Sequence, residues 1–125
     1  MTTQTDESAI AQALEEYYFN ASYEGDLNKL KHIFHPGTLL FGDVKGLPYA
    51  KSLNEWLDAV ANRQSPKDSG KPFKGDILNI KVVNSVAIAE VQVKAYDMLY
   101  HDFLSLHRID GNWRIVSKIM SGVNQ

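Results

Sequence analysis

The segment that most constrains the fold is the last quarter of the chain, where two stretches of alternating apolar residues flank Asp110-Gly111. Asp-Gly between such stretches is a strong signal for a β-hairpin, because tight primed turns need residues that tolerate a positive φ. We therefore predict paired strands over residues 99–109 and 113–121. Two further strands are expected just upstream, over residues 77–83 and 86–96.

Three helices are expected before these strands. One-sided apolar spacing predicts the first, which Thr5 or Asp6 caps and Gly25 ends. Its apolar stripe consists of Ile10, Ala13, Leu14, Tyr17 and Ala21. A second, short helix starts at Asp26, and Pro36 prevents its continuation. The third follows Ser52-Leu-Asn-Glu55, which has the pattern of a capping box.

Between the second and third helices, residues 38–41 predict a brief strand. Residues 62–75 carry two Pro, two Gly and no apolar period, so we expect a long polar connection there. Helices followed by a run of antiparallel strands indicate an α+β fold with the helices packed on one face of a curved sheet. A strongly curved sheet with three N-terminal helices on its concave face makes a cone, and a cone can hold a pocket.

Composition limits the possible functions. The 125 residues suit a single domain spanning 1–125. A net charge of −2 and the absence of a long basic cluster argue against nucleic acid as a partner. The chain has no cysteine, which excludes disulfides and thiolate chemistry and favours the cytoplasm. No long apolar run or export signal is present, so no membrane association is expected.

Several short motifs, in this order and spacing, resemble the nuclear transport factor 2-like superfamily, which includes the SnoaL cyclases and ketosteroid isomerase. They are Tyr18 with Gly25-Asp26-Leu27, Phe34-His35-Pro36, Tyr100-x-Asp102-x-Leu104-x-Leu106, and the Asp-Gly-Asn-Trp-Arg-Ile-Val hairpin with Ile115-Val-Ser-Lys118. Within the superfamily the combination is most similar to the putative lumazine-binding proteins. The resemblance covers nearly the whole chain and implies the cone-shaped fold.

The resemblance to ketosteroid isomerase also suggests catalytic residues. That enzyme uses a tyrosine and a protonated aspartate as oxyanion donors and a second aspartate as base. Tyr18 stands at the spacing of its tyrosine. Its base aligns with Gly42, one residue before Asp43, and its second acid aligns with Ser105. Asp43 is therefore the candidate base, whereas Ser105 argues against a true steroid isomerase.

The hairpin turn decides which strand face lines the pocket. A two-residue turn pairs Ile109 with Asn112 and places one set of side chains on the pocket face. This set is His101, Phe103, Ser105, His107, Val116, Lys118 and Met120. The opposite face is apolar and is expected to form a homodimer contact. It consists of Tyr100, Asp102, Leu104, Leu106, Trp113, Ile115 and Ile119. A three-residue turn would instead put Trp113 and Ile115 on the His107 face.

Each candidate has a plainer interpretation. Tyr18 is either an oxyanion donor or a core tyrosine beside Leu14. Asp43 is either a general base or a solvated turn residue. Lys118 either holds an anionic or carbonyl group of a ligand, or makes a salt bridge to Asp43 or Asp102, or reaches water.

The remaining candidates are His101 and His107, which titrate near neutral pH but lie roughly 20 Å apart along a strand. Trp56 is expected in the core or the pocket wall. His32 and His35 lack a metal-protease glutamate, so no metal site is expected.

Three functions remain open. The first is binding of an apolar or aromatic small molecule, for example a pterin- or lumazine-like ring, oriented by Tyr18, Lys118 and His107. The second is an isomerase, cyclase or dehydratase in which Asp43 or a histidine moves a proton while Tyr18 stabilises the oxyanion. The third is a dimeric interaction module without a ligand. The sequence has no phosphate-binding glycine loop or dinucleotide fingerprint, so no cofactor is expected.

Overall fold

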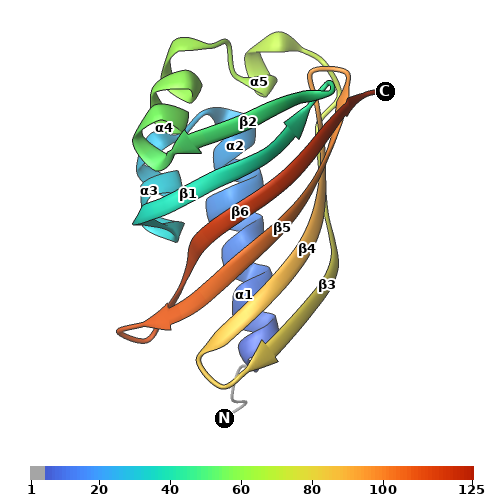
Figure 1. The fold of residues 1–125 in the computed structure, drawn as a ribbon. Coiled ribbons are helices and arrows are strands. Elements are labelled where there is room, and N and C mark those ends of the chain that lie inside the picture. Colours follow the sequence, from blue (N-terminus) through green and yellow to red (C-terminus); the bar gives the residue numbers. More distant parts are fainter. Residues whose placement is uncertain (1–4) are drawn as a thin grey trace.

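The computed structural model describes residues 5–125, and its six strands form one sheet in the order β2-β1-β6-β5-β4-β3 (Figure 1). The strands are β1 (Phe34–Val44), β2 (Leu47–Ser52), β3 (Lys74–Val83), β4 (Val86–Ala95), β5 (Met98–Ile109) and β6 (Asn112–Asn124). The expected α+β class is confirmed. The sheet is mixed, because β1 and β6 pair in parallel while every other neighbouring pair is antiparallel. β2, which pairs with β1, was not predicted.

The helices begin with one continuous rod made of α1 (Asp6–Leu14), η1 (Glu15–Asn20) and α2 (Ala21–Glu24). The Thr5 hydroxyl oxygen accepts a hydrogen bond from the Ser8 N–H at its start, and Gly25 ends it with a φ of 71°. The rod lies across the concave face of the sheet (Figure 1). None of the helices within residues 5–125 is long and apolar enough to cross a membrane.

Three shorter helices follow the rod and complete the helical layer. Asp26 caps α3 (Leu27–Ile33), and the predicted capping box of Ser52 and Glu55 starts α4 (Leu53–Asn62). The predicted polar connection contains a single helical turn, α5 (Pro66–Ser69). α4 and α5 lie together at one end of the sheet (Figure 1).

The middle of the rod, η1, is a π-helix, and it turns two consecutive aromatic side chains toward the sheet. Tyr18 and Phe19 are both buried there, whereas Tyr17, which the helical spacing placed on the apolar face, is half-buried against the His32 ring. A π-helical turn holds more residues than an α-helical turn and shifts the side chains that follow it. Phe19 then packs so closely on β3 that a Cβ at Gly75 would lie 2.4 Å from its ring. The π segment therefore sets the position of Tyr18.

The final hairpin has the predicted two-residue turn, because Ile109 pairs with Asn112. Just beyond the pair Leu106 and Ile115, the register between β5 and β6 shifts by one residue, so that Ser105 pairs with Ser117 and Lys118 with Leu104. A shift of one residue exchanges the faces of a strand. Lys118 and Met120 consequently face inward as predicted, whereas the side chains of β5 face the opposite way from the prediction.

Candidate functional site

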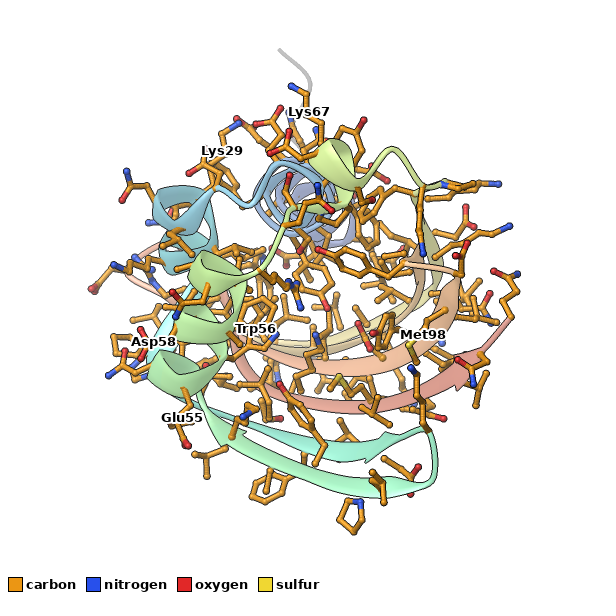
Figure 2. The ribbon with its side chains drawn as sticks, turned by 90° about the horizontal axis from the view of Figure 1, so that it is seen from above. Lys29, Glu55, Trp56, Asp58, Lys67 and Met98 are labelled. Atoms are coloured by element: carbon orange, nitrogen blue, oxygen red, sulfur yellow. The ribbon has the colours of Figure 1, made fainter. Side chains whose placement is uncertain are left out.

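A cavity of about 130 Å³ lies between the helices and the concave face of the sheet. Its lining is mainly aromatic and apolar, with a few polar groups. The lining residues are Tyr18, Ser22, Val44, Tyr49, Trp56, Arg63, Pro66, Phe73, Val93, Ala95, Tyr96, Tyr100, Asp102, Lys118 and Met120. Trp56 points inward from α4, while Glu55 and Asp58 of the same helix point outward (Figure 2). A cavity of about 150 Å³ in another protein holds one benzene molecule, so this space suits a small compound.

Tyr18 and Asp102 form a buried hydrogen bond in the wall of this cavity. The Tyr18 hydroxyl donates to Asp102 Oδ2 over 2.6 Å, and both residues are at most 2% exposed. Burial and the neighbouring Asp102 carboxylate raise the pKa of Tyr18 well above its ordinary value. Tyr18 is therefore a neutral hydrogen-bond donor at physiological pH.

Lys118 of β6 places a buried amine beside the same carboxylate. Its Nζ lies 3.8 Å from Asp102 Oδ2 and about 5 Å from the centres of two rings, 5.2 Å for Tyr18 and 5.0 Å for Trp56. Burial lowers the pKa of Lys118, while the Asp102 carboxylate opposes this change and the Arg63 charge adds to it. The expected salt bridge to Asp102 is thus one of the interactions of Lys118, and the side chain also lines the cavity.

The second oxygen of Asp102 has no partner within residues 5–125. Asp102 Oδ1 is buried and accepts no hydrogen bond there. A buried carboxylate oxygen without a donor is unfavourable unless water or a ligand supplies one. Asp102 also lines the cavity, so the unpaired oxygen belongs to a residue of the cavity wall.

Arg63 and three tyrosines form the polar rim of the cavity. Arg63 is exposed, and its guanidinium carbon lies 5.4 Å from the centre of the Tyr96 ring. Burial raises the pKa of Tyr49 and Tyr100, and the nearby Arg63 charge partly offsets this rise. The rim therefore presents the Arg63 cation and the neutral hydroxyl groups of Tyr49 and Tyr100 to an entering molecule.

The structure brings together four of the predicted site residues. Tyr18, Trp56, Lys118 and Met120 all line the cavity. Asp102 completes the cluster, although sequence reasoning placed it on the opposite face. A sequence signal for Asp102 was available. Asp102 shares one strand face with Leu104 and Leu106, and a face with two leucines most often packs in the core.

His101, Phe103, Ser105 and His107 lie on the outer face of β5, so their predicted place beside Lys118 is wrong. Ser105 and His107 instead line a second hollow with Val116 and Ile88. The register shift near Val116 separates them from Lys118. The His101 ring contacts Glu90 Oε2 through Nε2 at 2.6 Å and Gln92 through Nδ1. Phe103 is 47% exposed, and His107 is also exposed.

Asp43 also lies outside the cavity, so its assignment as the base is a second correction. It is exposed, and its Oδ1 accepts a hydrogen bond from the Gly46 N–H in the β1–β2 turn. Gly42 shares the inner face with Leu40 and Val44. A Cβ at Gly42 would lie 1.8 Å from the Met120 carbonyl oxygen, so no carboxylate fits there.

His35 binds the Gly37 N–H through Nδ1, and residues 5–125 contain no group of three metal-ligating side chains.

The outer face of the sheet carries an apolar strip, but with different residues from those predicted. Phe41, Ile119 and Phe103 are neighbours across β1, β6 and β5, and each is about half exposed. Leu39 and Ile88 are similarly exposed on the same face. Of the predicted contact residues, only Ile119 belongs to this strip, because Leu104, Leu106, Trp113 and Ile115 are buried in the core and Tyr100 and Asp102 line the cavity.

Comparison with known proteins assigns the chain to a family. Residues 5–121 match the family described as "Putative lumazine-binding". The chain belongs to the putative lumazine-binding family. One curated relative is the aldolase FrzH of Cladobotryum sp., which is 30% identical over 102 residues, or 82% of this chain and 80% of that protein.

Solved structures place this lumazine-binding family member in the nuclear transport factor 2-like superfamily. An NTF-2-like protein of unknown function from Silicibacter pomeroyi is 25% identical, covers 98% of this chain and 100% of its own, and has a TM-score of 0.85. A similar protein from Shewanella baltica is 24% identical over the whole of both chains, with a TM-score of 0.83. The predicted superfamily and its subgroup are both confirmed.

Proposed function

We propose that the protein is an enzyme that binds a small carbonyl compound and moves a proton at the carbon next to the carbonyl group. Isomerases and aldolases share this step. The observation that carries the proposal is the buried cluster of Tyr18, Asp102 and Lys118 in the wall of a largely apolar cavity.

The cluster is difficult to explain by stability alone. Burying a carboxylate and an amine has a desolvation cost of several kcal/mol per ion, which their attraction offsets only with good geometry and additional hydrogen bonds. Here the pair is 3.8 Å apart and one carboxylate oxygen has no donor within residues 5–125. Buried ionisable groups with strong mutual influence in a cleft are typical of functional sites.

The geometry supports a role for each member. Asp102 is the proton acceptor, because it lines the cavity and its Oδ1 accepts no hydrogen bond within residues 5–125. Lys118 activates the carbonyl group through its buried amine. Tyr18 holds Asp102 in position through its hydrogen bond to Oδ2. These assignments replace Asp43 and the histidines of the sequence-based scheme.

Arg63 indicates the kind of carbonyl compound. A guanidinium at the rim favours a substrate whose far end carries a carboxylate, because Arg binds carboxylates through two parallel hydrogen bonds. The relative FrzH is named an aldolase, and aldol chemistry begins with removal of the proton next to a carbonyl. We therefore propose an aldol-type reaction on a short, anionic carbonyl compound.

A second candidate function is binding without turnover. The free Asp102 Oδ1 is an acceptor that suits an N–H group of a pterin- or lumazine-like ring, and the family description points to the same ligand class. The surrounding aromatic side chains would stack on such a ring. This candidate predicts tight binding of pterins and no proton exchange.

The experiment that tests the proposal follows α-proton exchange by NMR in D₂O with acetone, pyruvate and longer 2-oxo acids. The wild type should exchange at least one of them, and Lys118→Met should reduce the rate roughly 100-fold or more, the usual contribution of a positioned catalytic group. Lys31→Met, which changes an exposed lysine, is the matched control. Exchange that is equal in the wild type and Lys118→Met would contradict the proposal.

We further propose that two copies of the chain pair through the apolar strip on the outer sheet face. Sheets pack face to face, and Phe41, Ile119 and Phe103 form a continuous row suited to such packing. Phe103→Glu should convert a dimer to a monomer in sedimentation experiments, whereas Leu47→Glu, an exposed apolar residue at the hairpin tip, should not. A wild-type monomer would contradict the pairing. The cytoplasmic location and the absence of nucleic acid partners stay predictions from composition.

A further inference from the structure

We propose that Lys118 is a covalent nucleophile, whose amine forms an imine with the carbonyl carbon of the substrate. This inference rests on the proposed function, since it requires a carbonyl compound in the cavity. It adds a bond between protein and substrate, which proton transfer alone does not need.

The first argument is the position of the amine. The Lys118 side chain is 7% exposed and lines the cavity, so the amine meets a bound molecule rather than bulk water. The nearest carboxylate oxygen, Asp102 Oδ2, lies 3.8 Å from Nζ, which is beyond hydrogen-bond distance. An amine that is held between two rings but not hydrogen-bonded keeps its lone pair available once it is deprotonated.

The second argument is the surroundings, which favour the neutral form of the amine. The rings of Tyr18 and Trp56 exclude water on two sides, and burial lowers the pKa of Lys118. Desolvation in an apolar pocket is a recognised way to make a lysine nucleophilic toward carbonyl compounds. The Arg63 charge acts in the same direction, while the Asp102 carboxylate opposes both effects on the pKa of Lys118.

The third argument is the place of Asp102, which can move the protons that imine chemistry requires. The amine nitrogen forms a bond to the carbonyl carbon, and the C=O bond breaks. The two protons that the amine loses leave with the carbonyl oxygen as one water molecule. A proton from solvent converts the imine to an iminium ion, Asp102 takes the proton from the adjacent carbon, and the electron pair moves toward nitrogen to give an enamine.

The enamine then has two fates that both conserve atoms and charge. Its carbon takes a proton or deuteron back, which is the exchange reaction, or it bonds to the carbonyl carbon of a second molecule, which is the aldol reaction. Addition of water to the resulting iminium ion releases the product ketone and restores the Lys118 amine. No oxidant, reductant or cofactor is needed.

The test is reductive trapping with sodium cyanoborohydride, using pyruvate and acetone as probes. The reagent reduces an iminium ion to a stable secondary amine, so the protein gains the mass of one probe molecule less one oxygen atom. Peptide mass spectrometry should place this adduct on Lys118 ahead of the exposed Lys31. The adduct on residue 118 should be lost in Lys118→Met and in Lys118→Arg, which keeps the positive charge, and should persist in Lys31→Met.

The outcomes separate this inference from the proposed function. A wild type that exchanges α-protons of a probe but is labelled at Lys118 no more than at Lys31 would overturn the imine and leave proton transfer standing. An adduct on Lys118 without exchange would confirm the imine and contradict the assigned role of Asp102. Neither exchange nor an adduct with any probe would overturn both.

Discussion

The Tyr18 hydroxyl donates a 2.6 Å hydrogen bond to Asp102 Oδ2, joining two residues that are 84 positions apart in the sequence. This bond connects the π-helical part of the rod to the middle of β5. Lys118 approaches the same oxygen from β6. The three side chains therefore tie the helical layer to the sheet at the wall of the cavity.

Loss of the Tyr18 hydroxyl should destabilise the fold. Tyr18→Phe removes a hydrogen bond to a charged group, and we expect the free energy of unfolding to fall by about 1.5 to 3 kcal/mol. Urea unfolding measures the change. Tyr17→Phe, at the neighbouring half-buried tyrosine, should have a much smaller effect. Equal effects of the two substitutions would show that the hydrogen bond to Asp102 adds no stability of its own to the folded protein.

The buried pair of Lys118 and Asp102 should behave as a coupled unit. Lys118→Met and Asp102→Asn should each destabilise the protein, because each leaves the other group without its charge partner, with a cost of about 3 to 5 kcal/mol at most. The double variant should be less destabilised than the sum of the two, with a coupling of about 0.5 to 3 kcal/mol. A double-mutant cycle in urea measures this coupling. Strict additivity would mean that the two groups do not interact.

Stability should depend on pH through Lys118. Its pKa is lowered in the folded protein from the ordinary 10.5. Between the lowered pKa and 10.5 the unfolded chain binds a proton that the folded protein lacks, so the stability contributed by Lys118 rises with pH and is lost as pH falls through the folded pKa. The raised pKa of Tyr18 acts only above 10.0, where it lowers stability. Below about pH 10, the wild type should therefore gain stability relative to Lys118→Met as the pH rises. Parallel pH profiles of the two proteins would contradict this.

Arg63 should select for anionic ligands. Arg63→Gln removes an exposed charge, whose ion pair with a ligand carboxylate contributes about 1 kcal/mol after solvent screening, so we expect roughly a 5-fold weaker affinity for a 2-oxo acid. Affinity for an uncharged ketone of the same shape should change little. Arg114→Gln is the matched control, because Arg114 binds the His32 carbonyl oxygen away from the cavity. Calorimetric titration with both ligands checks the difference, and an equal loss for both would exclude carboxylate recognition by Arg63.

Most helices and strands could be predicted from the sequence, because their signals lie in a few adjacent residues. The Asp110-Gly111 turn, the capping box of Ser52 and Glu55, and the stop at Gly25 each depend on a few adjacent residues and all occur where predicted. β2 was missed because Pro48 and the exposed side chains around it do not give a strand pattern. The parallel pairing of β1 with β6 involves residues far apart in the chain, which no local signal reports.

The site was predicted only in part, because one register shift between β5 and β6 decides which side chains of β5 lie beside Lys118. Counting from the turn correctly placed Ile109 opposite Asn112, but the bulge near Val116 changed the partner of Lys118 from Phe103 to Leu104. A bulge inserts a residue without a reliable sequence signature. Tyr18 was predicted at the site from its spacing in the resemblance to ketosteroid isomerase, but the helical spacing gave no sign of the π segment that buries Tyr18 and Phe19 together.

The most direct test of the proposed function is the rate of α-proton exchange in Asp102→Asn, an isosteric change that removes the proton acceptor and keeps a hydrogen-bonding side chain at the cavity wall. Asp58→Asn, at an exposed position of α4, is the control for the loss of one carboxylate (Figure 2). We predict that Asp102→Asn binds the carbonyl probe but exchanges its protons roughly 100-fold more slowly than the wild type, while Asp58→Asn keeps the wild-type rate. A folded Asp102→Asn protein with the full exchange rate would contradict the account.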